Sequence, residues 1–224
     1  MAEFRQIPDP IYEYEIAQIV RAYKNAIERI KRELDRLDVS DISRANAAAT
    51  LAEIARILRE LNEESAQWVE ENIPKAAQDG VVRAIVALTT IKSVEEAAKI
   101  AKFNRLNKAL VDAAIADTQA DLLAVTQNVE RRVRQAVRQV TGESLRANMA
   151  AGINGRRTIA RDILAGLRQR LGGSVETGII DAAGRRWKPE VYVDMVTRTK
   201  LMNVHMEATT NEAVSRGALY GVIS

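Results

Sequence analysis

Apolar residues recur three and four positions apart in two stretches of the first third of the chain. The first stretch contains Ile16, Ile19, Tyr23, Ile27, Ile30, Leu34 and Leu37. The second contains Leu51, Ile54, Leu58, Leu61, Ser65 and Trp68. This spacing places one apolar seam along each of two helices. Because residues 38–43 between them are rich in helix-capping side chains, we expect the two helices to form an antiparallel hairpin.

Proline and glycine indicate where the next helices break. Pro74 predicts a helix boundary or a kink, because proline clashes with the preceding helical turn. A shorter helix over about 75–90 is expected to be interrupted at Gly80. Ser93, with a glutamate three residues later, matches a helix-capping box. No proline or glycine follows until Gly142, so we predict one helix of nearly fifty residues there.

The distal half of this long helix carries a seam of its own. Its members are Leu122, Val125, Val129, Val133, Ala136 and Val140. A helix of that length extends for roughly 70 Å at about 1.5 Å per residue, more than a compact domain of this size needs. The seam therefore needs a partner, which is either the first hairpin or another chain.

The residues after Gly142 predict a different architecture. A helix is expected over about 156–171, followed by a β-hairpin over 177–189 with its turn at 181–184. A final helix is expected from about Val191 to Arg216, ended by Gly217 in a left-handed conformation. The apolar residues after Gly217 indicate a short strand, so the chain looks cut off inside a domain.

These elements together predict a mainly α protein with two domains. Residues 1–141 are expected to form a coiled-coil-like bundle of long helical hairpins. Residues 142–224 are expected to form a small, basic α+β domain with a β-hairpin, apparently truncated. The composition agrees, because apolar residues make up 47% of the chain but aromatic residues only 4%, and alanine favours long, thin helices.

The chain contains no cysteine, which excludes disulfides and thiolate metal sites. No stretch approaches the ~18 consecutive apolar residues of a membrane span, and the N-terminus lacks the apolar run of a signal peptide. We therefore expect a soluble protein that stays on the side of the membrane where it is made.

The formal net charge of +3 conceals an asymmetry along the chain. Residues 1–128 carry 17 Lys/Arg against 21 Asp/Glu, whereas residues 129–224 carry 16 against 9. The candidate contact residues in the basic part are Arg131, Arg134, Arg138, Arg156, Arg157, Arg161 and Arg168. One interpretation is that these arginines form a solvated face or salt bridges to the acidic first half of the chain. The other is contact with an acidic partner, either packaged DNA or an acidic protein ring.

The second apolar seam supplies a different candidate site. A seam that is not covered within the chain would dock on a neighbouring protein. The residues that we predict for such docking are Leu51, Leu58, Leu61 and Trp68.

A catalytic site is not predicted. His205 is the only histidine, and we interpret it as a structural or surface residue. Phosphate-binding glycine loops, dinucleotide fingerprints and nucleophile elbows are absent. We accordingly predict no catalytic, cofactor-binding or metal-binding residue. Trp187, Tyr192 and Met195 are expected in the core of the α+β domain, and Arg198 is expected to pin a loop carbonyl or a carboxylate.

Several short motifs, in this order, resemble one known family. They are Ile73-Pro74-Lys75-Ala76, Phe103-Asn104-Arg105-Leu106-Asn107, Thr118, Asp121-Leu122-Leu123, Thr126-Gln127-Asn128, Gly184-Arg185-Arg186-Trp187-Lys188-Pro189, Tyr192-Val193-Asp194-Met195, Arg198-Thr199, Asn211-Glu212-Ala213 and Gly217. The set is similar to the phage minor capsid protein 2 family, which is related to the protein F-like head-morphogenesis domain of phage Mu. In that family a His- and Cys-bearing segment follows the final strand, and the sequence here ends at Ser224, before the position of that segment.

The resemblance implies a structural protein of the virion of a tailed phage or prophage. It implies a place at or near the portal, in the capsid interior, with a role in head assembly and in DNA packaging or ejection. The implied partners are the portal protein, the major capsid protein or both, with several copies per virion, and the arginines add packaged double-stranded DNA, bound without sequence specificity, as a candidate partner. The alternatives are a scaffold-type coiled-coil adaptor, or the N-terminal part of an enzyme such as an ADP-ribosyltransferase.

Overall fold

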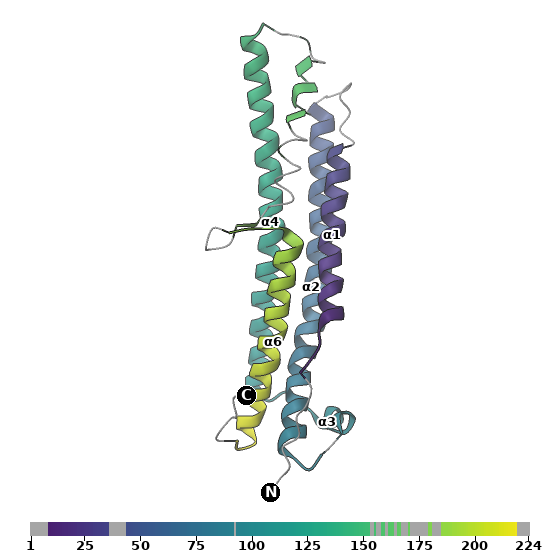
Figure 1. Cartoon of the computed structure of the whole chain (residues 1–224), viewed down its shortest axis with the longest axis vertical. Coiled ribbons are helices and arrows are strands. Elements are labelled where there is room, and N and C mark those ends of the chain that lie inside the picture. The colour runs from purple at the N-terminus through teal and green to yellow at the C-terminus, as the bar shows by residue number, and fades with distance from the viewer. Residues whose placement is uncertain are drawn as a thin grey trace. The chain divides into compact units, whose positions relative to one another are not determined.

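The protein is mainly α-helical in a computed structural model, which describes residues 9–35, 44–91, 93–152, 155, 158–159, 161–163, 165–166, 170, 179–180 and 185–218 (Figure 1). The helices are α1 (Glu13–Asp35), α2 (Arg44–Leu88), α3 (Val94–Ile100), α4 (Arg105–Ala150) and α6 (Pro189–Ser215). Two short strands, β1 (Ile179–Ile180) and β2 (Arg186–Trp187), precede α6.

The chain folds into two compact units, each assembled from separated segments. Unit 1 comprises Met1–Gln18, Ser65–Asp121 and Asp194–Ser224. Unit 2 comprises Ile19–Glu64 and Leu122–Val193. The predicted division of the chain into domains 1–141 and 142–224 stays a prediction.

The seam of α4 is buried in unit 2, as its spacing predicts. Leu122, Val125, Val129, Val133 and Val140 are at most 3% exposed. The same unit buries Ile19, Tyr23, Ile27 and Ile30 of α1 together with Ile54, Ile57, Leu58 and Leu61 of α2. The Tyr23 hydroxyl donates a hydrogen bond to the Leu122 carbonyl at 3.0 Å, which satisfies a polar group inside this apolar layer. The predicted helical seams are therefore confirmed, and they pack inside the chain.

Unit 1 has a core of smaller residues between α2 and α6. Ile73, Ala76, Ala77, Val81 and Ile85 of α2 are fully buried, as are Leu201 and Ala208 of α6. The two helices approach closely at Gly80, where an added Cβ would lie 2.3 Å from the His205 carbonyl oxygen. The alanines and Gly80 allow this approach because their side chains are small or absent.

The predicted helix boundary at Pro74 and the predicted interruption at Gly80 are both wrong, whereas the alternative of a kink at Pro74 stays a prediction. α2 continues through both residues from Arg44 to Leu88. Proline removes one backbone hydrogen bond from the helix, but the neighbouring residue Ile73 is fully buried, and this packing offsets the loss. Gly80 lies inside the helix where the backbone of α6 passes so close that a larger side chain would not fit.

The single helix predicted after Ser93 is instead two helices. The Ser93 cap is confirmed, since the Glu96 amide donates to the Ser93 hydroxyl at 3.4 Å. However, α3 ends at Ile100, and residues 101–104 are not helical. Asn104 caps the next helix, because its side-chain oxygen accepts a hydrogen bond from the Asn107 amide at 2.8 Å. α4 then continues through Gly142 to Ala150.

The predicted C-terminal α+β domain is not seen in the residues that the structure describes. The two strands form only an antiparallel pair of two residues each, with Ile179 opposite Trp187 and Ile180 opposite Arg186. The final helix, predicted over 191–216, is confirmed as α6, and Gly217 follows it with a φ of +84°. Its apolar residues Val196, Leu201, Val204 and Ala208 are buried in the helical core of unit 1.

The other C-terminal predictions are only partly covered by the structure. Met195, expected in the core of the α+β domain, is 38% exposed. Trp187 is half-buried, with the Arg185 guanidinium 5.4 Å from the centre of its ring. Half of the residues in the predicted helix over 156–171 are described, and these are helical, whereas the hairpin turn at 181–184 and residues 219–224 lie outside the described residues.

Candidate functional site

Three of the predicted contact arginines form an exposed face on α4. Arg131, Arg134 and Arg138 are exposed, whereas Val133 and Val140 of the same helix are buried. Successive helical residues turn by about 100°, so the spacing of three and four that aligns the arginines also places them opposite the apolar seam. We call these three residues the arginine face.

The arginine face is only partly neutralised by its neighbours. The Arg134 guanidinium forms an ion pair with Glu130 at 2.6 Å, and Arg131 donates a hydrogen bond to the neutral side chain of Asn128. Arg138 forms no ion pair among the described residues. The three arginines line an open surface hollow together with Gln127, Glu130, Gln135 and Gln139. The hollow therefore offers two cations without a carboxylate partner among the described residues, surrounded by amide donors.

The remaining predicted arginines are distributed differently. Arg161 is exposed, whereas Arg156, Arg157 and Arg168 lie outside the described residues. Arg170, on the same predicted helix, pairs with Glu143 at 2.8 Å. The described part of the structure thus groups Arg131, Arg134 and Arg138 on one face. It does not test the predicted contacts of the arginines at 156, 157 and 168.

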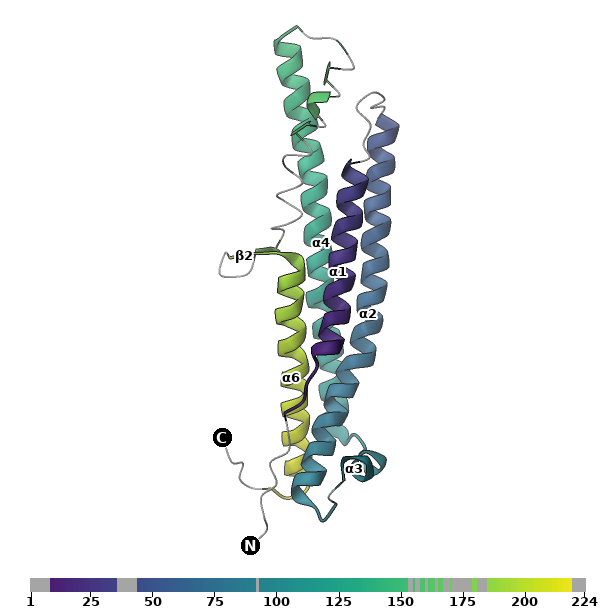
Figure 2. The same cartoon turned by 45° about the vertical axis from the view of Figure 1, so that its right-hand side comes forward.

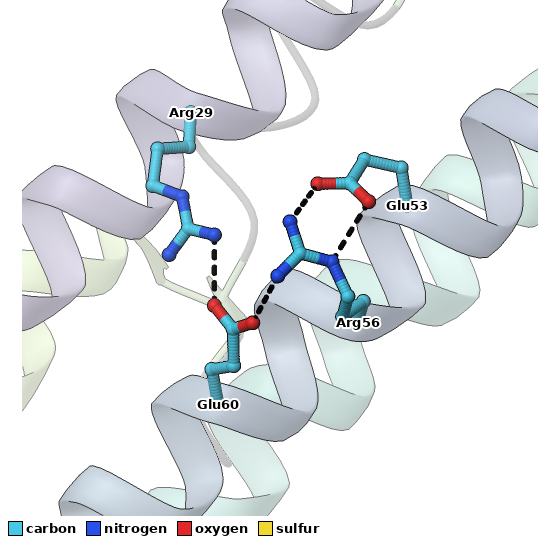
Figure 3. Close-up of polar contacts among 4 residues, drawn as sticks. All are labelled: Arg29, Glu53, Arg56 and Glu60. Carbon is cyan, nitrogen blue, oxygen red and sulfur yellow. Dashed lines mark hydrogen bonds and ion pairs between the residues drawn. The ribbon is translucent and has the colours of Figure 1, made fainter.

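Arginines elsewhere in unit 2 bind carboxylates of the chain itself. Arg29 of α1 donates to Glu60 of α2 at 2.7 Å (Figure 3). Arg56 also binds Glu60, and its Nε donates to Glu53 at 2.8 Å (Figure 3). Arg29 holds the pKa of the Glu60 carboxyl below its usual value, because the hydrogen bond favours the carboxylate. These two arginines are already neutralised, in contrast to Arg138.

The fold concentrates basic residues in one unit. Unit 2 carries 22 Lys/Arg against 15 Asp/Glu, a formal charge of +7. Unit 1 carries 11 against 15, a formal charge of −4. An anionic partner is therefore attracted to unit 2, where the arginine face lies.

The residues predicted for docking are mostly inside the chain. Leu58 and Leu61 are each 3% exposed, Trp68 is 6% exposed, and Leu51 is half-buried. The Trp68 indole donates a hydrogen bond to the Glu15 carbonyl at 2.8 Å. Docking through this seam stays a prediction, and it would require the helices to separate first.

Two polar clusters in unit 1 were not predicted as such. In one, Asn104 donates to the buried Glu212 carboxylate at 3.3 Å, and Arg216 donates to the same group at 2.7 Å. In the other, the buried His205 is hydrogen-bonded to Tyr12. His205 is therefore not a surface residue, and its hydrogen-bond partner is 193 positions away, so no local pattern indicates it. The expectation for Arg198 is also confirmed, since it binds the Glu13 carboxylate at 2.9 Å.

The described residues contain neither a metal-ligand cluster nor a helix suited to a membrane. No cluster of three or more His, Asp or Glu side chains there could hold a metal ion. None of the helices described has the length and apolarity required to cross a membrane.

Comparison with known proteins agrees with the motif resemblance. The model of the phage minor capsid protein 2 family matches residues 11–222. No curated protein and no solved structure matches the chain significantly. Since the family match spans all of the described helices, the chain belongs to the phage minor capsid protein 2 family.

Proposed function

We propose that the protein is a structural component of a tailed-phage or prophage head, located at or near the portal. Its family membership implies a structural role in the virion and capsid proteins as partners. Within that role we assign it to head assembly and to the packaging or ejection of DNA. The exposed arginine face on a unit of charge +7 is the observation that carries this assignment.

The arginine face supports binding to the phosphate backbone of double-stranded DNA. Arginine donates to phosphate oxygens in a fixed, forked geometry and keeps its charge at all physiological pH values. The surface hollow is lined by arginines, glutamines and Glu130, without an aromatic side chain among its described residues on which single-stranded bases could stack. Binding of this kind ignores base sequence. An acidic protein ring is the other partner that such a face fits.

Replacing all three residues of the arginine face by glutamine is expected to weaken binding to double-stranded DNA. Each phosphate that the protein no longer neutralises reduces the slope of log K against log salt concentration by about 0.9, so the triple variant should reduce it by up to about 3. Fluorescence anisotropy with two duplexes of unrelated sequence, between 50 and 200 mM salt (roughly the range over which such binding fades), measures this slope.

The matched control is the double variant Arg29→Gln/Arg56→Gln. It also removes arginines from unit 2, but these side chains already bind Glu53 and Glu60 (Figure 3). We expect this variant to change the salt slope much less. Salt-insensitive binding, or an equal reduction of the slope in the two variants, would reject DNA contact through the arginine face.

Quantitative mass spectrometry of DNA-filled particles tests the place of the protein in the virion. We expect a stable small number of copies per mature particle, and cross-links from exposed lysines to the portal protein. Presence in precursors but absence from mature particles would instead identify a scaffold-type adaptor. Absence from both would reject a virion role and favour the enzyme alternative.

A further inference from the structure

The residues just before and at the start of α1 form a strap along unit 1. We use the name N-terminal strap for residues 9–15; its first part is the dark purple trace beside α6 in Figure 2. The ring of Tyr12 is buried, whereas Ile11 and Tyr14 are 81% and 72% exposed. Most of the strap's large apolar side chains therefore point into solvent, and the strap depends on other contacts to stay in place.

Polar contacts connect the strap to α2 and α6. Asp9 pairs with Arg83 of α2 at 3.2 Å, and Glu15 pairs with Lys75 of α2. At the centre, the Tyr12 hydroxyl lies 3.1 Å from His205 Nδ1 and donates to Asp79 Oδ2 at 3.4 Å. One hydroxyl therefore joins the strap to α6 and to α2 at the same point.

The surroundings of His205 make this junction sensitive to its protonation state. His205 is 5% exposed, and its Nε2 has no hydrogen-bond partner among the described residues. The Tyr12 ring packs edge-on against the imidazole, with ring centres 6.3 Å apart. A second proton on the imidazole would place a full positive charge in this buried position, which is costly without a close counter-charge.

We propose that Tyr12, His205 and Asp79 form a pH-operated latch that holds the N-terminal strap on α2 and α6 and opens when His205 is protonated. The latch goes beyond the capsid role and does not depend on DNA binding. It provides a conformational change that acidification can trigger.

The charged groups around His205 set the direction of the effect. Burial lowers the pKa of His205 below 6.5, and the positive charge of Arg83 lowers it further. Asp9 and the Ala76 backbone oppose this shift but do not overcome it. The closed strap is therefore fully stable above pH 6.5, and that stability is lost as the pH falls through 6.5 towards the lowered pKa.

The other ionisable groups of the latch do not promote its opening at mildly acidic pH. Burial raises the pKa of Asp79 above 3.8, so the closed strap favours its protonated form and Asp79 opposes opening at lower pH. The Lys75 charge partly offsets that shift. The pKa of Tyr12 is raised by burial and by Asp79, which keeps its hydroxyl protonated. Glu15 pairs with Lys75, which favours its carboxylate. A loss of protection between pH 7.5 and about 5.5 is therefore attributable to the histidine, because protonation of Asp79 acts in the opposite direction.

Hydrogen exchange of the full chain provides the main test. The Ile16 amide donates to the Tyr12 carbonyl at 3.0 Å and reports directly on the strap. Its protection factor, corrected for the intrinsic rate at each pH, is expected to fall several-fold from pH 7.5 to about 5.5. Amides of α4 near Val133 should keep their protection, which distinguishes strap opening from global unfolding.

Three variants identify the groups responsible. In His205→Gln the Ile16 protection should no longer change between the two pH values. Tyr12→Phe should lower that protection at pH 7.5, because the ring remains but the hydroxyl is removed. Tyr14→Phe is the matched control, since Tyr14 lies two residues away and is 72% exposed, and it should behave as wild type.

The single histidine gives a readout that needs no variant at position 205. Because His205 is the only histidine, one imidazole NMR signal reports the latch alone. It should titrate below pH 6.5 in the wild type and closer to 6.5 in Tyr12→Phe. Titration at or above 6.5, an Ile16 protection factor that does not change with pH, or identical behaviour of Tyr12→Phe and Tyr14→Phe would overturn the latch.

Discussion

Leu58→Asp is expected to unfold the protein, not to act selectively on partner docking. Leu58 is 3% exposed in the core of unit 2, so the new carboxylate would be buried without a counter-charge. Such a charge costs about 3–5 kcal/mol, a large part of the roughly 5–15 kcal/mol that stabilises a folded protein. Urea denaturation followed by circular dichroism measures this destabilisation directly.

Leu123→Asp is the matched control for this substitution. Leu123 is also a helical leucine of unit 2, but it is 42% exposed. Its replacement should change the free energy of unfolding by less than about 1 kcal/mol, as is usual for surface positions. If Leu58→Asp were as stable as Leu123→Asp and yet failed to enter particles, the seam would be a docking site after all, and its burial in the isolated chain would be transient.

Gly80→Ala is expected to destabilise the protein by about 1–3 kcal/mol or more, the usual cost of overpacking. In most helices this substitution stabilises, because alanine has the higher helix propensity. Here the added Cβ would lie 2.3 Å from the His205 carbonyl oxygen and 3.1 Å from the Thr209 amide nitrogen. These are backbone atoms, so α2 and α6 would have to move apart to accommodate the methyl group.

Gly142→Ala should have the opposite sign and serves as the control. Gly142 lies inside α4, where an added Cβ meets only the end of the Arg146 side chain, at 3.7 Å. We expect stabilisation by about 0.5–1 kcal/mol, from helix propensity and from the reduced entropy of the unfolded chain. Equal effects of the two substitutions in thermal or urea denaturation would contradict the close approach of α2 and α6 at Gly80.

The apolar seams and the arginine face were predictable because both follow from the helical repeat. Once Val133 and Val140 are assigned to a buried seam, the rotation of about 100° per residue directs Arg131, Arg134 and Arg138 away from it. The final helix and its end at Gly217 were predictable for a similar reason, since glycine readily adopts the left-handed conformation that ends a helix.

The helix breaks were harder to predict because local signals compete with packing. Pro74 and Gly80 are usual helix breakers, yet both lie inside α2, where burial of their neighbours and the close approach of α6 decide the outcome. The break before α4 did have a local signal. Asn104 is a favoured capping residue, but the absence of proline and glycine around it suggested a continuous helix.

The candidate docking seam shows where sequence periodicity stops being informative. The spacing of Leu58, Leu61 and Trp68 requires that these side chains be covered, but the covering surface could belong to the same chain or to another protein. Within this chain all three are already buried. The exposed arginine face is therefore the better candidate for a partner contact.

Local periodicity and capping chemistry account for most of the helices and for their buried and exposed faces, because each depends on residues within a few turns of one another. The junctions between helices do not follow from such patterns. Tyr12 meets His205 and Glu13 meets Arg198 across more than 180 positions of sequence, and Gly80 is required only because α6 passes close to it. Contacts of that kind exist only after the chain has folded, because tertiary packing selects which of several compatible surfaces come together.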